Sequence, residues 1–220
     1  MIKSFLKTKP FLYNFLKKII CNIQRKRNNR FTHIYSKSPL LRIKKDCIGL
    51  DNVCIIEEAT VGQLRFHIRG NNNRIKIGSN CSFGANCSLW IEGNNSEIII
   101  GDNTTMTHTC HINCQEDNMK IVIGRDCMFS NNIIIRTSDS HPIYDTNTDE
   151  RINPPKNVIL GNHIWIAPNS KIMKGAIIGD NSIIGSDTTV GKEIGENVLV
   201  VGRPGRVVKT NVRWTREKLF

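Results

Sequence analysis

Residues 157–190 read NVILGNHIWIAPNSKIMKGAIIGDNSIIGSDTTV, and an aliphatic side chain returns at every sixth position of this stretch. The recurring residues are Leu160, Ile166, Ile172, Ile178, Ile184 and Val190. A six-residue period matches neither an α-helix, whose apolar face follows a period of about 3.6 residues, nor a simple alternating strand. It fits a short strand followed by a tight turn, with three such units forming one triangular coil around inward-pointing aliphatic side chains. The stretch therefore predicts a β-helix.

The same pattern recurs upstream and extends the predicted β-helix over about residues 47–208. Four segments restart one phrase, a strand-like run closed by glycine: RIKIG (74–78), EIIIG (97–101), KIVIG (120–124) and NVILG (157–161). The first three are spaced by 23 residues, which equals one coil of 18 plus an excursion of five. GNNN (70–73) and GNNS (93–96) supply turn-forming residues for these excursions.

Composition limits the class of protein. The chain has 220 residues, 39% hydrophobic and 23% charged, and a mean hydropathy of −0.28, which excludes a polytopic membrane protein and a disordered chain. The net charge of +12 invites a nucleic-acid partner. However, 13 of the 31 basic residues precede Asp46, the first acidic residue, and the remaining chain carries 18 basic and 19 acidic groups. We therefore expect a nearly neutral body with a cationic N-terminal arm, and no nucleic acid.

The arm, residues 1–45, contains a predicted amphipathic helix over 11–26. Its apolar residues fall at helical spacing, and Pro10 suits the start of a helix. Lys17 and Lys18 interrupt the apolar run, so we expect neither a signal peptide nor a membrane span in this segment. Two interpretations remain open: a helix lying on an anionic membrane surface through residues 1–30, or a helix packed on the body or a partner subunit.

The eight cysteines predict reduced thiols rather than disulfides or a metal site. Cys81, Cys87 and Cys127 lie inside the aliphatic repeat, where cysteine acts as a small hydrophobic residue. Cys110 and Cys114 are four residues apart, and no second cysteine pair has zinc-finger spacing. We therefore expect no metal and a cytoplasmic location. If the N-terminal arm lies on a membrane, the expected surface is the inner face of the plasma membrane.

The period fails between Ile135 and Leu160, where residues 136–156 form a predicted inserted loop. Function in solenoid proteins concentrates in such loops. This one contains His141 followed by Pro142, and histidine is the usual general base for a poorly nucleophilic hydroxyl. Asp139 and Asp145 are both candidates to orient its imidazole.

The pattern resembles the hexapeptide-repeat acyltransferases, most strongly at residues 157–179 and at VGRPGRVV (201–208). The resemblance implies a left-handed parallel β-helix, a homotrimer with active sites between neighbouring subunits, and acetyl-CoA as the donor. SDSHPIYD (138–145), with Trp165 24 residues after the histidine, looks most like the bacterial capsule and polysialic acid O-acetyltransferases. That subgroup implies His141 as the general base and Trp165 as a residue that positions the reacting groups. The alternative for His141 is a solvated loop residue without a catalytic role, and the alternative for Trp165 is a residue that only packs on the outside of a coil.

The resemblance also suggests binding residues. Basic side chains after the last full coil would contact the phosphates of acetyl-CoA, and small residues along a coil edge would line its pantetheine arm. The candidates are Lys192, Arg203 and Arg206 for the phosphates, and Ala167, Pro168, Gly185 and Ser186 for the pantetheine. The candidates for the acceptor are Ser140, Tyr144 and Arg136. An ordinary charged C-terminal cap is the alternative for the two arginines that follow the coils.

These observations predict an all-β enzyme with an N-terminal helix. Its parts are the arm (1–45), the β-helix (46–208, with loop 136–156 inserted) and a C-terminal tail (209–220). The predicted reaction moves acetyl from acetyl-CoA to a hydroxyl of a capsular or surface polysaccharide, with a sialic acid polymer as the first candidate acceptor. The predicted partners are this sugar acceptor, two further copies of the chain and, through residues 1–30, the membrane or a capsule-synthesis complex. An N-acetyltransferase for an amino sugar or nucleotide-sugar and a non-catalytic β-helix scaffold are the alternatives.

Overall fold

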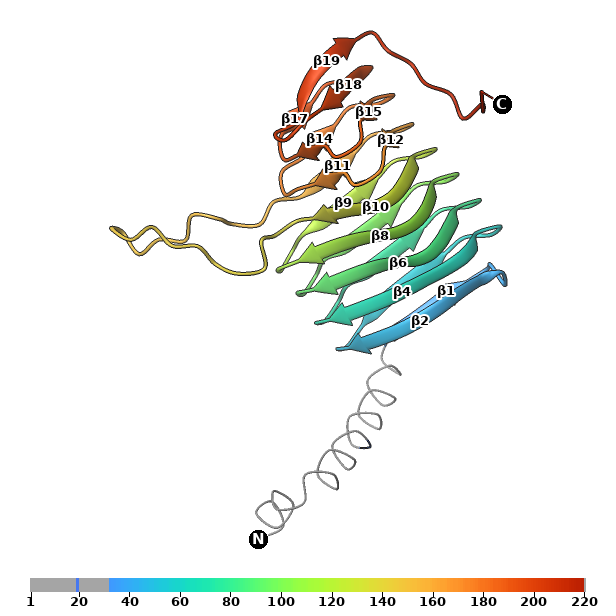
Figure 1. Cartoon of the computed structure of the whole chain (residues 1–220). Helices are drawn as coiled ribbons and strands as arrows, with labels where there is room; N and C mark the ends of the chain where they lie inside the picture. The colour runs from blue at the N-terminus through green and yellow to red at the C-terminus, as the bar shows by residue number, and fades with distance from the viewer. Residues whose placement is uncertain (1–18, 20–31, 220) are drawn as a thin grey trace, which may run out of the picture.

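The computed structural model describes Ile19 and residues 32–219. The predicted helix over 11–26, the membrane contact through residues 1–30 and Cys21 therefore lie outside the described residues, except for Ile19. The described chain is a stack of triangular coils that rises from β1 to β19, with one long loop leaving the stack (Figure 1).

Two long sheets run the length of the stack, and strands in successive coils pair in parallel. The first sheet contains, in spatial order, β1 (Thr32–Ser36), β3 (Asn52–Ile56), β5 (Arg74–Ile77), β7 (Glu97–Ile100), β9 (Lys120–Ile123), β11 (Val158–Leu160), β14 (Ile177–Ile178) and β17 (Glu193–Ile194). The second contains β2 (Leu41–Ile48), β4 (Val61–Arg69), β6 (Ser82–Glu92), β8 (Thr105–Gln115), β10 (Met128–Arg136), β12 (Trp165–Ile166), β15 (Ile183–Ile184), β18 (Val198–Val201) and β19 (Arg206–Thr210). Among these pairs, only β18 and β19 are antiparallel.

Each long strand of the second sheet covers two sides of the triangle. The start of β10 pairs with β12 (Met128 with Trp165), whereas its end pairs with β13 (Lys171–Ile172). β13 in turn pairs with β16 (Thr189–Val190). A coil therefore has three corners. We call them the first corner (before β10 and β12), the second corner (midway along β10, and between β12 and β13) and the third corner (after β10 and β13).

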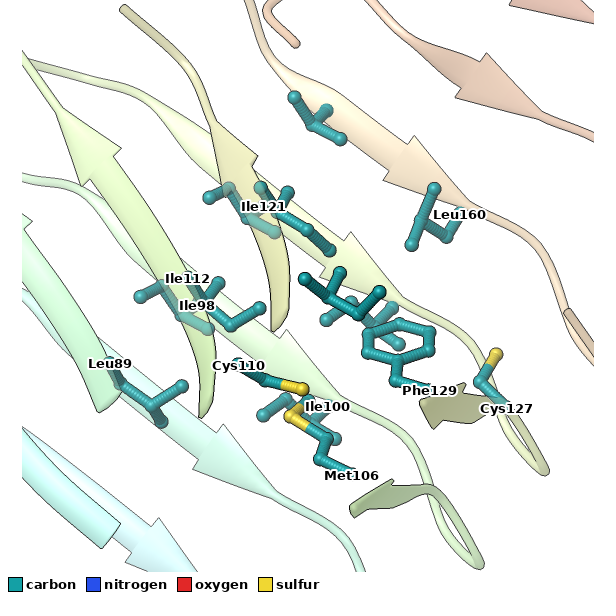
Figure 2. Close-up of a cluster of buried hydrophobic side chains, with 14 of the residues drawn as sticks. Leu89, Ile98, Ile100, Met106, Cys110, Ile112, Ile121, Cys127, Phe129 and Leu160 are labelled. Carbon is teal, nitrogen blue, oxygen red and sulfur yellow. The ribbon is translucent and has the colours of Figure 1, made fainter. Parts of the chain in front are cut away.

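The core fills the inside of the triangle and follows the six-residue period. Every recurring residue of the longest run, from Leu160 to Val190, is at most 1% exposed. Figure 2 shows aliphatic side chains from adjacent coils stacked on one another, with Phe129 and Met106 among them. The seven cysteines in the described residues are buried, and burial raises the pKa of thiols such as Cys127, to about 12. The interpretation of Cys81, Cys87 and Cys127 as small core residues is confirmed.

The excursions stack as expected from the 23-residue spacing. The amide N–H of Asn71 donates to the side chain of Asn94 (2.9 Å), and that of Asn94 donates to the side chain of Asp117 (2.8 Å). Gly70 has φ +124°, and a Cβ there would lie 2.0 Å from the carbonyl oxygen of Gly93. Glycine is therefore required where these turns approach each other.

The ends of the stack differ from the predicted boundaries. β1 and β2 pair with β3 and β4, so the first coil starts at Thr32 and the predicted boundary at residue 46 falls inside β2. At the other end, β19 runs to Thr210, and the chain after it crosses back over the second sheet. The predicted tail therefore includes the end of β19.

Candidate active site

The inserted loop leaves the third corner after β10 and is folded, not open. Its neck is closed by a hydrogen bond from the Lys156 amide to the Thr137 carbonyl (3.0 Å). Further out, Tyr144 and Arg151 form an antiparallel bridge, and the amide of Ile152 donates to the carbonyl of Ile143 (2.9 Å). The inserted loop, called the loop arm below, thus resembles a hairpin and projects well beyond the stack (Figure 1).

An ion pair ties this arm to the coil below. The Arg151 guanidinium donates two hydrogen bonds to the Glu116 carboxylate, at 2.6 and 2.7 Å, and Ser138 Oγ donates a third at 2.5 Å. These hydrogen bonds, that from Arg151 foremost, lower the pKa of Glu116. Two-point contact by a guanidinium adds directional restraint, so the loop is held at its base and along one side.

His141 lies on the exposed surface of this arm. Its backbone carbonyl accepts a hydrogen bond from Asn153 Nδ2 (2.9 Å), while its imidazole has no hydrogen-bond partner among the described residues. The same amide group donates to Asp139 Oδ2 (3.0 Å), and Asn153 Oδ1 accepts from the amide of Ile143 (2.8 Å). Asn153, which is 7% exposed, therefore fixes the backbone on both sides of Pro142.

Neither aspartate proposed from the sequence orients the imidazole within one chain. Asp139 accepts a hydrogen bond from the Lys174 ammonium, which, with Asn153, lowers its pKa. Asp145 accepts hydrogen bonds from the amides of Asn147 and Thr148, at 2.8 and 3.1 Å, and closes the tip of the loop. The first organises the base of the arm and the second organises its turn.

The three acceptor-binding candidates lie near His141, at two levels. At the base, the Arg136 guanidinium donates to Ser140 Oγ (2.8 Å) and to Gln115 Oε1 (3.2 Å), so Ser140 is held beside the last residue of β10. On the arm, Tyr144 is 53% exposed. Arg136 and Ser140 thus connect the arm to the outer face of the second sheet.

Trp165 lies elsewhere, at the start of β12 by the first corner. It is half-buried, and its ring centroid is 6.0 Å from that of Trp214 in the C-terminal tail. Trp214 stacks on His163 (3.9 Å between centroids) and donates from Nε1 to the His163 carbonyl (2.9 Å). The tail thereby forms one side of the environment of Trp165, which no local pattern in the sequence predicted.

Charged groups lock the tail at this corner. His163 Nδ1 and Asp126 Oδ2 are 2.6 Å apart, and Arg216 Nε donates to the other Asp126 oxygen at 2.6 Å. The same guanidinium also donates to Thr105 Oγ1 and to the carbonyls of Asn103 and Cys127. Burial by itself would raise the pKa of Asp126, but the hydrogen bonds from Arg216 and His163 outweigh it and lower the pKa.

Most cofactor candidates meet at the second corner. The amide of Asp187, next to Ser186, donates to the carbonyl of Pro168 (2.9 Å), and the amide of Gly185 continues the stack to Val200 (2.8 Å). Ala167 is buried beside them at 6% exposure. Arg203 reaches the same corner, where its Nε donates to the Asp187 carbonyl (2.6 Å) and its guanidinium pairs with the Asp187 carboxylate.

The remaining two candidates are placed apart from this group. Arg206 begins β19 and is exposed. Lys192 lies at the third corner, in the same column as Lys174 and the inserted loop. In one chain the three predicted elements thus occupy three places: the histidine at the third corner, the tryptophan by the first, and most donor-binding candidates at the second.

The described part of the chain lacks two features that would define other kinds of site. Its His, Cys, Asp and Glu side chains include no group of three or more that could hold a metal ion. None of its helices is long and apolar enough to cross a membrane.

Known proteins share this sequence and architecture. The family model described as bacterial transferase hexapeptide (six repeats) matches residues 157–192. A polysialic acid O-acetyltransferase of Neisseria meningitidis is 32% identical over 163 residues, which cover 66% of this chain and 71% of that protein. The chain belongs to the hexapeptide-repeat acyltransferases.

Further acetyltransferases similar to this chain support its assignment to the family. A polysialic acid O-acetyltransferase of Escherichia coli O1:K1 / APEC is 33% identical over 91 residues, which span 41% of this chain and 30% of that relative's length. The chain in the crystal structure of the polySia specific acetyltransferase NeuO is 28% identical in sequence to this chain. The two superpose with a TM-score of 0.72, over 87% of this chain and 85% of that one. That of the polysialic acid O-acetyltransferase OatWY is 29% identical, with a TM-score of 0.62 over 85% and 89%. The predicted left-handed β-helix and family are confirmed.

Proposed function

We propose that this acyltransferase moves an acetyl group from acetyl-CoA to a hydroxyl of a bacterial capsular polysaccharide, with polysialic acid as the acceptor. The observation that carries the proposal is the folded loop that presents His141, whose ring has no partner among the described residues, in a chain 32% identical to an enzyme named for this reaction. Two solved structures named for the same specificity share its architecture.

The chemistry assigned to His141 is general base catalysis. As the sugar hydroxyl oxygen forms its bond to the thioester carbon, the neutral imidazole takes the hydroxyl proton. When the carbon–sulfur bond breaks, the imidazolium returns this proton to the departing thiolate. A loop held by Asn153 and by the Arg151–Glu116 pair keeps the ring in place, which lowers the entropic cost of reaching the reactive geometry.

The active site of this proposal is shared between copies of the chain. The ladder partner of Trp165 is Met128 at the start of β10, whereas the loop leaves at the opposite end of that strand (Figure 1). At about 3.3 Å per residue, eight residues of strand correspond to roughly 26 Å of chain that also turns a corner. We propose a homotrimer in which the inserted loop of one copy brings His141 to the Trp165 of its neighbour.

The donor would bind along the second corner. Pro168 and Ser186 supply a narrow edge there, and Arg203 is a cation at the same corner. Arg203 is paired with Asp187, so a phosphate would have to compete with that carboxylate for the guanidinium. Residues 1–30 lie almost entirely outside the described chain, so their membrane contact and the cytoplasmic location stay predictions.

The decisive test is acetyl transfer by the purified full-length protein. We expect acetyl-CoA and polysialic acid to give a product seen by mass spectrometry, which mild alkali removes because it is an O-ester. His141→Ala should abolish transfer, and Thr146→Ala on the same loop, whose side chain is exposed, is the matched control. An alkali-stable product would instead indicate N-acetyl transfer. Transfer unaffected by His141→Ala would refute the general base assignment.

Mixed oligomers test the shared site. His141→Ala and Trp165→Ala chains should each be inactive alone, and refolding them together should restore roughly a quarter of the activity, because each residue is intact in half of the copies. No recovery from properly assembled mixtures would mean that both residues act from one chain.

A further inference from the structure

Two hollows open next to each other on the outer face of the second sheet, below the inserted loop. They have volumes of about 560 and 620 Å³ and share Lys44, Arg65 and Trp90 as lining residues. Both lie within the range of about 300–1,000 Å³ typical of small-molecule sites. We call the pair the basic groove. It crosses β2, β4, β6 and β8, a width of about 14 Å at roughly 4.8 Å per strand.

The basic groove carries unpaired positive charge. Lys44, Lys45 and Arg65 line it, and Asp46 is the acidic residue among the lining residues. Asp46 is already neutralised, since its carboxylate accepts a hydrogen bond from Arg69 at 2.9 Å. Within the described chain, the side chains of Lys44 and Arg65 form no ion pair or hydrogen bond. The groove therefore presents cations that can bind an anion without first giving up a partner.

Its remaining lining is suited to a sugar. Trp90 is half-buried, and its Nε1 is a buried donor with no hydrogen-bond partner among the described residues. One ring face of Trp90 lies against His67, with centroids 3.7 Å apart, which leaves the indole unsuited to stack successive bases as single-stranded nucleic acid requires. His111, whose Nδ1 is 2.7 Å from Ser88 Oγ, and Asn113 add groups that can bind hydroxyls.

Burial and the nearby Arg65 both lower the pKa of His111. The lowered pKa favours the neutral ring, whose second nitrogen can donate or accept a hydrogen bond. The ladder continues from the groove to the loop, because Trp90 pairs with Asn113 and Asn113 with Arg136. Arg136 bonds Ser140, the residue before His141.

We propose that the basic groove binds a carboxylate-bearing segment of the polysaccharide acceptor, several sugar units away from the unit that is acetylated. Lys44 and Arg65 pair with its carboxylates, while Trp90, His111 and Asn113 contact the sugar rings and hydroxyls. This inference rests on the proposed function for the identity of the polymer. It adds a second binding site that favours long acceptors over short ones, because a chain held at two places pays the cost of association once.

The test is equilibrium binding of long polysialic acid to the full-length protein, without acetyl-CoA, by titration calorimetry. The variant is Lys44→Glu/Arg65→Glu, and the matched control is Lys76→Glu/Arg74→Glu, two exposed cations of β5 on the other sheet. We expect the groove variant to bind at least tenfold more weakly and the control to change less than twofold. Polymer with its carboxylates methylated should bind wild-type protein as weakly as the groove variant binds native polymer.

Kinetics separate this inference from the proposed function. If transfer occurs, the groove variant should raise KM for long polymer about tenfold and leave kcat, and KM for a sialic acid dimer, unchanged. If no transfer is seen but the binding results hold, the inference stands and the proposed function fails. Equal binding by the groove and control variants, tight binding of methylated polymer, or preference for single-stranded DNA over polymer would each overturn the inference.

Discussion

Arg216 makes an ionic contact of the C-terminal tail beside Trp165, in addition to the stacking of Trp214 on His163, so Arg216→Ala should weaken the docking of the tail. Arg216 makes one hydrogen bond to the Asp126 carboxylate and three to neutral oxygens. A hydrogen bond to a charged group contributes about 1.5–3 kcal/mol, but this guanidinium is 33% exposed and water competes for it. We therefore expect these four hydrogen bonds, which we call the Arg216 clamp, to stabilise the docked tail by about 2 kcal/mol. This corresponds to a change of roughly thirtyfold in the population of the open tail.

Limited proteolysis measures this opening. Chymotrypsin should cut after Trp214 only when the tail lifts, because that residue is 7% exposed in the docked state. We expect Arg216→Ala to accelerate this cut roughly thirtyfold, followed by mass spectrometry, and to leave the thermal midpoint of the β-helix nearly unchanged. Arg213→Ala removes an exposed arginine of the same tail and should change the rate less than twofold. Equal rates for the two variants would refute the clamp.

Two further predictions concern the loop and pH. Asn153→Ala leaves the carbonyl of His141 and the amide of Ile143 unpaired. We therefore expect amide hydrogen exchange within residues 137–157 to rise at least tenfold and acetyl transfer to fall, with Thr146→Ala as the control. Unchanged exchange would contradict the role of Asn153. Asp126 has a folded pKa below its unfolded value of about 3.9, so its contribution is complete above that value and is lost as pH falls through the folded pKa. The indole NMR signal of Trp214 should therefore report tail release below about pH 4 but none between pH 5 and 8, and release that begins near neutrality would point to another group.

The coil could be predicted because its information is local. A side chain at every sixth position points into the triangle, whichever coil it belongs to, so the run from Leu160 to Val190 is buried as expected. The same pattern did not predict the first coil, formed by β1 and β2. Among the described residues it has a neighbouring coil on one side only, and β2 carries exposed lysines at positions where inner coils carry buried side chains, as Lys45 opposite Phe66 shows.

The candidate site could be predicted in part. A break in the period marked the loop and His141, but its internal order depends on Asn153, whose contacts span 10–14 residues within a stretch without periodicity. The basic groove was missed because its residues come from four strands, each about one coil apart, and no single strand looks unusual. Arg65, Trp90 and His111 meet only when the coils are in register.

The repeating unit, its inward face and the position of the inserted loop can be read from the sequence, since each of these depends on residues within one or two turns of the same coil. The corner that each functional candidate occupies, and the return of the tail to the second sheet, depend instead on contacts between residues far apart in the chain. Trp214 contacts His163 across 51 positions and Arg216 contacts Asp126 across 90. Such pairs are set by how many coils lie between them and by where the chain leaves the last one, which a short-range pattern does not encode.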